Sequence, residues 1–116
     1  MRITLKNQKI FSMAGLWTTW TKPDGKKLYT CTIVTTQANK QMSKIHDRMP
    51  VILDKKAEKT WLNPDIIDLN ELKKLLHTTD VLDLNIYPVT NQIGSPSFNT
   101  MECISPIKIN EAPSLF

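Results

Sequence analysis

The sequence has few of the residues that build disulfide frameworks and metal sites. Its 116 residues include two cysteines and two histidines. Cys31 and Cys103 are far apart and outside any C-x-x-C pattern, and in a reducing compartment such cysteines stay as thiols. A structural zinc site needs four Cys or His ligands at close spacing. The sequence therefore predicts no disulfide scaffold, no metal site and no cofactor.

The chain also lacks long apolar runs. It contains no stretch of about 18 apolar residues, the length that spans a bilayer. Its start, MRITLKNQKIF, has no long apolar segment and no small-residue cleavage site of a secretory signal. Internal repeats and low-complexity segments are absent from the sequence as well. We therefore expect a cytoplasmic protein without a membrane partner, with residues 1–116 forming a single domain.

The charges are distributed unevenly along the chain. Residues 1–60 contain 12 Lys and Arg against 4 Asp and Glu, whereas residues 61–116 contain 3 against 7. A basic half suits a polyanion such as nucleic acid, because contacts from Lys and Arg to phosphate supply most non-specific affinity. The alternative is a solvated basic face without a ligand.

A hairpin is the first predicted element. Residues 9–20 are apolar and aromatic, and residues 28–36 are β-branched and partly alternating. Between them, Pro23, Asp24 and Gly25 form a turn sequence. Gly15, in the middle of the first strand, predicts a bulge or a close approach of another backbone.

Three short helices are predicted from apolar spacing and capping residues. They cover residues 37–46 after the N-cap Thr36, residues 55–62 after Asp54, and residues 69–77 after Asp68. Short strands are predicted at 51–53 and 81–87, with an edge strand at 102–109. Because strands and helices mix without the alternation of a doubly wound sheet, the pattern predicts an α+β fold.

The segment KIHDRMPVIL, residues 44–53, places His46, Asp47 and Arg48 between a predicted helix and a predicted strand. A histidine at a helix end can cap the last carbonyl groups, and Asp47 with Arg48 can form a local ion pair. Alternatively the segment is a site, in which the histidine moves protons near neutral pH and the arginine holds an anionic group. The segment alone leaves both interpretations open.

Four segments taken together carry a resemblance. FSMAGLW, TCTIVTTQAN, IHDRMPVIL and WL, in this order and at these spacings, resemble the SOS-response-associated peptidase (SRAP) family, strongly over residues 11–62 and more weakly over 63–108. Members of that family sense abasic sites in single-stranded DNA. The resemblance implies a β-rich α+β fold, with a mixed sheet or partial barrel and about three short helices, and a basic groove for single-stranded DNA.

The resemblance also implies a chemistry. In family members, the cysteine after the initiator methionine attacks the aldehyde of an opened abasic sugar, and its amine and thiol close a thiazolidine ring. Self-cleavage of a leader, where one exists, frees the same cysteine and gives the family its peptidase name. By residue matching, His46 assists ring opening and proton transfers, Arg48 contacts the DNA backbone and Thr35 lines the abasic-site pocket. Structural roles are expected for the neighbouring motif residues Asp47, Met49 and Pro50.

The sequence departs from the family at the nucleophile. Residue 2 is arginine where the family has cysteine. A thiazolidine needs the thiol and a free amine on one residue, so the internal Cys31 and Cys103 do not substitute. The family's Asn-Ala-Arg segment and its Tyr-Glu-Trp segment, which carries the active-site glutamate, have no counterpart. We therefore expect a truncated domain, the C-terminal half of an SRAP-like fold, that does not act as a crosslinker or peptidase alone.

Three hypotheses for such a half remain open. In the first, a separate N-terminal SRAP fragment completes the groove, or the chain self-associates through an open sheet edge. In the second, the chain is a non-catalytic fragment that binds single-stranded DNA. In the third, it is a structural or interaction protein that has lost the DNA role.

The tryptophans also have two interpretations. Trp17 and Trp20 are three apart on a predicted strand, so they point to opposite faces and at most one faces the core. Aromatic faces can stack on unpaired bases, but core packing is the expectation for Trp17 or Trp20. For Trp61, on the helix after Asp54, core packing is expected.

Overall fold

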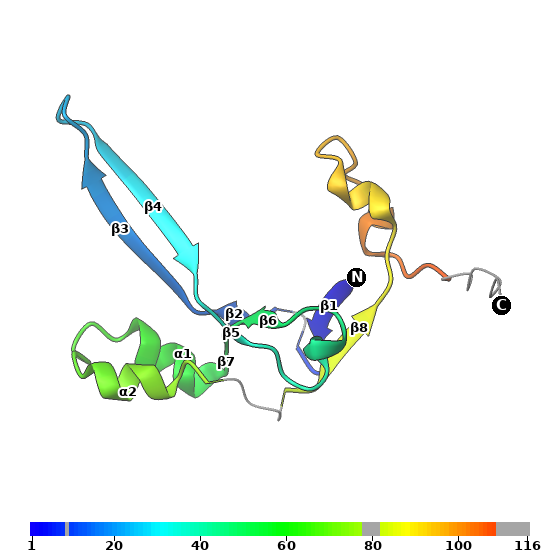
Figure 1. Cartoon of the computed structure of the whole chain (residues 1–116), viewed down its shortest axis with the longest axis horizontal. Coiled ribbons are helices and arrows are strands. Elements are labelled where there is room, and N and C mark those ends of the chain that lie inside the picture. The colour runs from blue at the N-terminus through cyan, green and yellow to red at the C-terminus, as the bar shows by residue number, and fades with distance from the viewer. Residues whose placement is uncertain (9, 78–81, 109–116) are drawn as a thin grey trace. The chain divides into compact units, whose positions relative to one another are not determined.

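The computed structural model describes residues 1–8, 10–77 and 82–108 and consists of two compact units (Figure 1). Unit 1 combines Met1–Lys9 with Asp83–Phe116, and unit 2 is Ile10–Leu82. The described residues form short strands, two α-helices and three 3-10 helices, which confirms the predicted α+β class. Their strands pair two by two in open sheets, and no closed barrel is formed. That residues 1–116 are one domain stays a prediction.

Unit 1 is built on a strand pair that the sequence only half predicted. β1 (Arg2–Leu5) pairs antiparallel with β8 (Leu84–Tyr87). β8 confirms the strand predicted there, whereas β1 was not predicted, because the first strand was placed near residue 10. The register sets Arg2 opposite Tyr87 and Ile3 opposite Ile86, so the pair has one polar and one apolar face.

The predicted edge strand at 102–109 is wrong for the residues that the structure describes. After η2 (Asn91–Gly94), this part of unit 1 forms a second 3-10 helix, η3 (Met101–Ile104). The Thr100 hydroxyl accepts from the amide of Glu102, and the Ser105 hydroxyl donates to the carbonyl of Met101. Such local side-chain bonds compete with strand pairing. Residue 109 lies outside the described residues.

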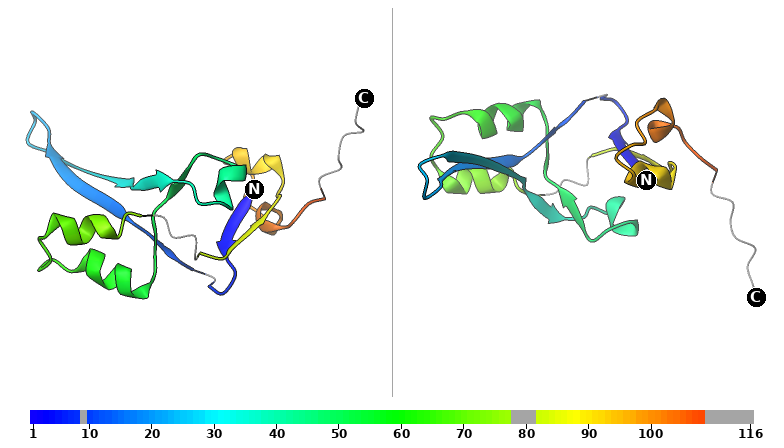
Figure 2. Two further views of the ribbon diagram at one scale, coloured as in Figure 1. Left: turned by 60° about the horizontal axis from the view of Figure 1, so that its bottom comes forward. Right: turned by 90° about the horizontal axis from the view of Figure 1, so that it is seen from above.

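Unit 2 contains three two-stranded ribbons. β2 (Ser12–Met13) pairs with β7 (Ile52–Leu53), β3 (Gly15–Thr21) with β4 (Lys27–Ile33), and β5 (Thr35–Gln37) with β6 (Arg48–Pro50). Figures 1 and 2 show the long β3–β4 ribbon and the shorter pairs. Helices α1 (Lys55–Leu62) and α2 (Leu69–Lys74) belong to the same unit.

The three ribbons meet at three single residues, Ala14, Val34 and Val51, which lie between consecutive strands. The amide of Ala14 donates to the carbonyl of Val51 at 2.9 Å, and the amide of Val34 donates to the carbonyl of Ala14 at 2.9 Å. The amide of Val51 then donates to the carbonyl of Val34 at 3.0 Å. The three hydrogen bonds form a closed cycle, called the three-way junction below.

The core of unit 2 surrounds this junction. Ala14 is 0% exposed and clusters with the buried Val51 and Leu53. Other hydrophobic side chains pack against the cluster, namely Val34, Ala57, Trp61, Leu75 and Leu76. Burial of these side chains is the main stabilising term available to the unit. Helix α1 and the turn that follows α2 therefore cover the apolar side of the junction.

The ends of the helices mostly follow the capping predictions. The Asp54 carboxylate accepts from the amide of Ala57 at 2.7 Å, and the Asp68 carboxylate accepts from the amide of Asn70 at 2.8 Å. α2 ends at Lys74, three residues before the predicted end. The indole of Trp61 donates to the carbonyl of Gly15 at 3.1 Å, so this side chain is partly buried against the core, as expected. None of the helices in the described ranges is long and apolar enough to cross a membrane.

The helix predicted at 37–46 is wrong over most of its length. Thr36, its expected N-cap, lies within β5, and only Met42–Lys44 form a helical turn, η1. Asn39 takes the capping role instead, since its side-chain oxygen accepts from the amide of Met42 at 2.9 Å. The apolar spacing of this segment reflects one buried residue, Met42, on a short turn.

The predicted hairpin is confirmed. β3 and β4 pair from Gly15 opposite Ile33 to Thr21 opposite Lys27. Gly25 has a φ of 80°, which favours glycine in the connecting turn. A Cβ atom at Gly15 would lie 3.2 Å from the carbonyl oxygen of Thr32, so the predicted close backbone approach exists.

The expected burial of a hairpin tryptophan is wrong. Trp17 and Trp20 lie on opposite faces, as the strand period required, but they are 74% and 55% exposed. Most of the β3–β4 ribbon extends beyond the core of unit 2, and its burial pattern is exposed at nearly every position. The sequence signal for apolar strands was correct, but the described residues supply no layer to cover them.

A hydrogen bond to Glu58 joins β2 to α1 and predicts a pH-dependent contribution to stability. The Glu58 carboxylate accepts from the Ser12 hydroxyl at 3.0 Å. This hydrogen bond and the nearby Lys55 ammonium lower the pKa of Glu58. A carboxyl group whose pKa is lowered by folding stabilises the fold at pH values above its pKa in the unfolded chain. This contribution is lost as the pH falls through its pKa in the folded protein. We expect Glu58→Gln to lower the free energy of unfolding slightly at neutral pH, with the difference vanishing in acid.

Urea denaturation of both proteins across the acidic range measures this difference. Ser12→Ala should reproduce this difference in the free energy of unfolding. The double variant should lose less stability than the sum of the two single variants, because both substitutions remove the same hydrogen bond. A difference that stays constant into acid would contradict the assignment.

Candidate functional site

The β5–β6 ribbon separates the predicted site residues from the core. In its register Thr35 lies opposite Pro50, Thr36 opposite Met49, and Gln37 opposite Arg48. Residues opposite each other in an antiparallel pair share a face. Met49 is buried, as expected for this motif position. Thr35 and Arg48 therefore lie together on the other, exposed face.

Arg48 is held directly by Thr35. Its Nη2 atom donates to the carbonyl oxygen of Thr35 at 2.7 Å and to the Thr35 hydroxyl at 3.0 Å. These are diagonal neighbours across the ribbon, a spacing that long side chains can bridge. A guanidinium has five N–H donors, and Thr35 takes those of Nη2. Both residues are exposed, so the donors on Nε and Nη1 are accessible to an anionic group.

His46 lies next to Arg48 and makes two contacts through one ring nitrogen. Nδ1 accepts from the backbone amide of Arg48 at 3.0 Å, and it is 3.0 Å from a carboxylate oxygen of Asp47. The first contact needs a lone pair on Nδ1 and the second needs a proton there, so they exclude each other. The neutral ring with its proton on Nε2 makes the first, and a ring protonated at Nδ1 makes the second.

The two contacts give His46 two chemical roles. When Nδ1 accepts from Arg48, Nε2–H is a hydrogen-bond donor. When Nδ1–H pairs with Asp47, a neutral ring has a lone pair on Nε2 and can act as a base. The side chain is 65% exposed, so either form of Nε2 is open to a ligand. In the Asp47-paired arrangement, the neutral ring can take a proton at Nε2, and the doubly protonated ring can give one, beside the Arg48–Thr35 pair.

Asn39 is a positioning residue that the sequence did not predict. It is 5% exposed, and besides capping Met42 its carbonyl accepts from the amide of Ser43 at 2.8 Å. Its amide donates to the Met49 sulfur at 3.4 Å. The segment from β5 to His46 is thus fixed to the ribbon from inside. Its position ahead of a turn, in QAN, is the signal that could have identified it, since Asn is a preferred cap.

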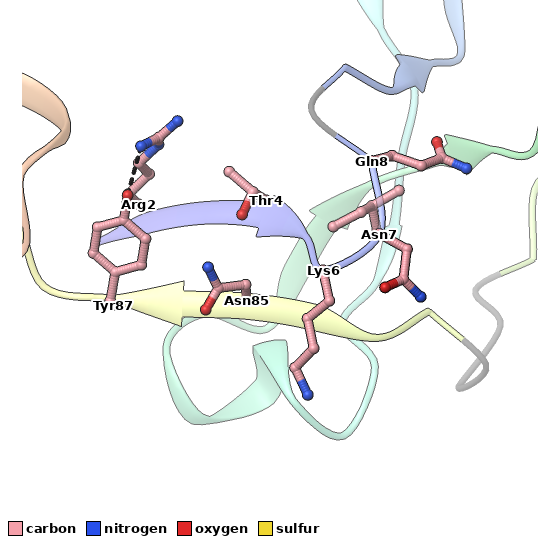
Figure 3. Close-up of a pocket in the computed structure, with 8 residues that line it drawn as sticks. Arg2, Thr4, Lys6, Asn7, Gln8, Asn85 and Tyr87 are labelled. Atoms are coloured by element: carbon pink, nitrogen blue, oxygen red, sulfur yellow. Dashed lines mark hydrogen bonds between the residues drawn. The ribbon is translucent and has the colours of Figure 1, made fainter.

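Two concavities are lined by residues away from the β5–β6 ribbon. One of about 560 Å³, in unit 1, is lined by residues of β1 and β8 and the following turn (Figure 3): Arg2, Thr4, Leu5, Lys6, Asn7, Gln8, Asn85 and Tyr87. Its two cations are engaged by the protein itself. Lys6 pairs with Asp83 at 2.8 Å, and Arg2 donates to the Tyr87 hydroxyl and to the carbonyl of Ile104. These contacts join β1 to β8 and η3. The two cationic side chains of the lining therefore have partners within the protein and do not indicate a bound ligand.

Metal-binding clusters are not found in the described part of the chain, where no three His, Cys, Asp or Glu side chains converge. Cys31 is exposed on β4, and Cys103 is a free thiol within η3. Both are internal, and neither lies among the three predicted site residues. The described groups that offer chemistry at the site are therefore an imidazole, a guanidinium and a hydroxyl.

The family model described as SOS response associated peptidase (SRAP) matches residues 1–96. The chain belongs to the SRAP family. This confirms the resemblance that the four sequence segments carried. The roles of His46, Arg48 and Thr35 stay predictions. The structure places these three residues together on one ribbon and its adjoining turn.

Curated relatives from bacteria and animals match most of this chain. The abasic site processing protein YoqW of Bacillus subtilis is 48% identical over 104 residues, covering 90% of this chain and 46% of the relative. The abasic site processing protein HMCES of Rattus norvegicus is 35% identical over 101 residues, covering 86% of this chain and 28% of the relative. The chain therefore spans less than half the length of these relatives.

A solved structure has the same arrangement within a longer chain. An X-ray structure of a Bacteroides thetaiotaomicron protein matches with a TM-score of 0.81 and 30% identity, covering 91% of this chain and 47% of that chain. The SRAP fold described here is thus found in a polypeptide about twice as long.

Proposed function

We propose that this chain provides the histidine, arginine and threonine side of an abasic-site-processing centre for single-stranded DNA, and that it is inactive alone. His46 transfers protons at the opened sugar, Arg48 holds a backbone phosphate, and Thr35 lines the sugar pocket. The observation that carries the proposal is the double hydrogen bond from Arg48 to Thr35 next to the His46 ring. Curated relatives named for abasic site processing support the same chemistry.

The reaction needs a nucleophile that these 116 residues do not offer. In thiazolidine formation, an amine adds to the aldehyde carbon of the opened sugar, water leaves as an imine forms, and the thiol of the same residue adds to the imine carbon. Cys31 and Cys103 are internal, so their amines are peptide nitrogens. The proposal therefore assigns the thiol and amine to polypeptide outside this sequence, as in an SRAP N-terminal half.

His46 fits the proton transfers of this sequence. Opening of the sugar leaves a negative oxygen that needs a proton, and the thiol must lose one before its sulfur adds to the imine. A ring protonated on both nitrogens, with Nδ1–H paired to Asp47, can give its Nε2 proton in the first step, and the neutral ring that remains can take the thiol proton at Nε2 in the second. Arg48 is suited to the flanking phosphate, because a guanidinium binds phosphate through parallel N–H donors.

Reconstitution with abasic DNA tests the proposal. The full chain is co-expressed with an SRAP N-terminal half that starts Met-Cys, and the complex is incubated with single-stranded DNA carrying one abasic site. We expect a covalent adduct on a denaturing gel that requires both polypeptides, because each supplies part of the centre. Intact DNA of the same sequence is the control. A folded complex that gives no adduct would reject the proposal.

The basic charge of residues 1–60 supports a second candidate, a non-catalytic fragment that binds single-stranded DNA. It predicts salt-dependent DNA binding by this chain alone, with no adduct even in the reconstituted complex. A structural or interaction role predicts neither DNA binding nor adduct. The reconstitution experiment, with a binding titration of the chain alone, separates all three.

A further inference from the structure

The β3–β4 ribbon is apolar on both of its faces. One face carries Trp17, Tyr29 and Ile33, which are 74%, 67% and 50% exposed. The opposite face carries Leu16, Trp20 and Leu28, which are also exposed. Large exposed apolar patches mark interaction surfaces in folded proteins. A two-stranded ribbon alone is also marginally stable in water, so this one needs covering on two sides.

We infer that the β3–β4 ribbon is the docking surface for polypeptide equivalent to the part of longer SRAP proteins that lies outside the match to this chain. The inference deepens the proposed function, on which it rests for the identity of the partner. Its partner is a β-rich polypeptide with apolar side chains that covers both faces of the ribbon. Among the described residues β3 and β4 pair only with each other, so their outer edges offer backbone hydrogen bonds to the same partner.

The length of the relatives supports this occupant. The same arrangement is found with a TM-score of 0.81 in a chain of which it makes up 47%. That chain therefore contains about as much polypeptide again outside the matched region. A segment of that size is large enough to cover two faces of one ribbon.

Single-stranded DNA fits the ribbon less well than polypeptide does. Surfaces that bind unpaired strands place basic residues along the backbone path, between the stacking aromatic side chains. In β3 and β4 the one charged residue is Lys27, at the turn end. Aliphatic side chains such as Leu16 and Ile33 offer no flat face for a base. The charge pattern therefore favours a protein surface.

A second copy of this chain also fits less well. A twofold-symmetric dimer brings the same patch of each subunit together, so it covers one face of each ribbon and leaves the other exposed. Since both faces are apolar to a similar degree, one symmetric contact would leave the second apolar face of each ribbon exposed to water. A different polypeptide has no such restriction.

Cys31 provides a reporter for docking, because it lies on β4 directly opposite Trp17 and is exposed. In Cys103→Ser protein, where Cys31 is the remaining thiol, we expect modification by a maleimide to slow at least about tenfold when the chain is co-expressed and purified with an SRAP N-terminal half. The complex should be 1:1 by light scattering. Neither measurement uses DNA, so docking can succeed while the proposed abasic-site function fails.

Substitution of the ribbon tests the contact itself. Trp17→Thr keeps a strand-forming residue and removes the largest exposed side chain of one face, and we expect it to weaken the complex at least about tenfold, as for a buried tryptophan anchor. Leu69→Gln is the matched control, since this α2 residue is 67% exposed but outside the ribbon. Arg48→Glu, which disrupts the proposed DNA site, should leave the affinity of the two polypeptides unchanged.

Three results would overturn the inference. The first is absence of a complex on co-expression, with Cys31 modified at the rate seen in the chain alone. The second is a stable homodimer in which Cys31 is protected, which assigns the ribbon to a second copy. The third is loss of single-stranded DNA binding in Trp17→Thr with an unchanged protein complex, which assigns it to DNA.

Discussion

Replacing Ala14 by leucine is expected to destabilise unit 2 strongly. Ala14 is 0% exposed, and both its amide and its carbonyl belong to the three-way junction. Three added carbon atoms have no space there unless the neighbouring strands move. Overpacking of a close-packed core costs typically about 1–3 kcal/mol. Separating the junction strands would also weaken hydrogen bonds, so we expect the upper part of that range.

Urea denaturation followed by tryptophan fluorescence measures this loss. The matched control is Met13→Leu, because Met13 is the preceding residue and its side chain is 45% exposed. Exposed substitutions usually change the free energy of unfolding by less than about 0.5 kcal/mol. Equal effects of the two substitutions would contradict the packing described for the junction.

Substitution of His46 is expected to have the largest effect on chemistry. In the reconstituted complex, His46→Gln should slow adduct formation by about 100-fold or more, since general acid–base catalysis contributes 10²–10⁴-fold in enzymes. Glutamine can still accept from the Arg48 amide and keep the turn in place, but it does not exchange protons near neutral pH. Single-turnover rates from denaturing gels, measured across the neutral pH range, provide the readout.

A neighbouring variant separates chemistry from structure. Lys44→Gln is the matched control, because Lys44 is an exposed residue of η1, two positions before His46, and exposed substitutions usually change stability by less than about 0.5 kcal/mol. Its rate should stay within a few-fold of wild type. A His46→Gln rate equal to wild type would remove the histidine from the mechanism.

Local chemistry in the sequence predicted local structure correctly. Asp54 and Asp68 cap their helices, and Gly25 has the positive φ that the turn needed. Predictions failed where a segment's structure depends on distant residues. The apolar spacing after Thr36 suits a helix, but pairing of Thr36 with Met49 makes that residue part of a strand. β1 has a weak strand signal and is formed by pairing with β8, about 80 residues later.

The candidate site was predicted unevenly for the same reason. His46 and Arg48 are separated by one residue, so their closeness was visible in the motif. Thr35 was named by resemblance alone, and its hydrogen bonds with Arg48 depend on the register of β5 and β6. Asn39 was missed because its importance comes from burial beneath Met49 and the turn, which spacing does not reveal. The burial expected for a hairpin tryptophan failed because it depends on a covering layer.

The three-way junction links the two surfaces to which partners are assigned. The β4 strand ends at Ile33, Val34 forms the junction, and Thr35 begins the ribbon that holds Arg48. A partner that fixes the direction of the hairpin therefore fixes the Thr35 backbone two peptide bonds further on. By thermodynamic reciprocity, any gain in DNA affinity caused by the protein partner must be matched by an equal gain in partner affinity caused by DNA. Assembly of the complex would then be favoured where a damaged strand is already bound.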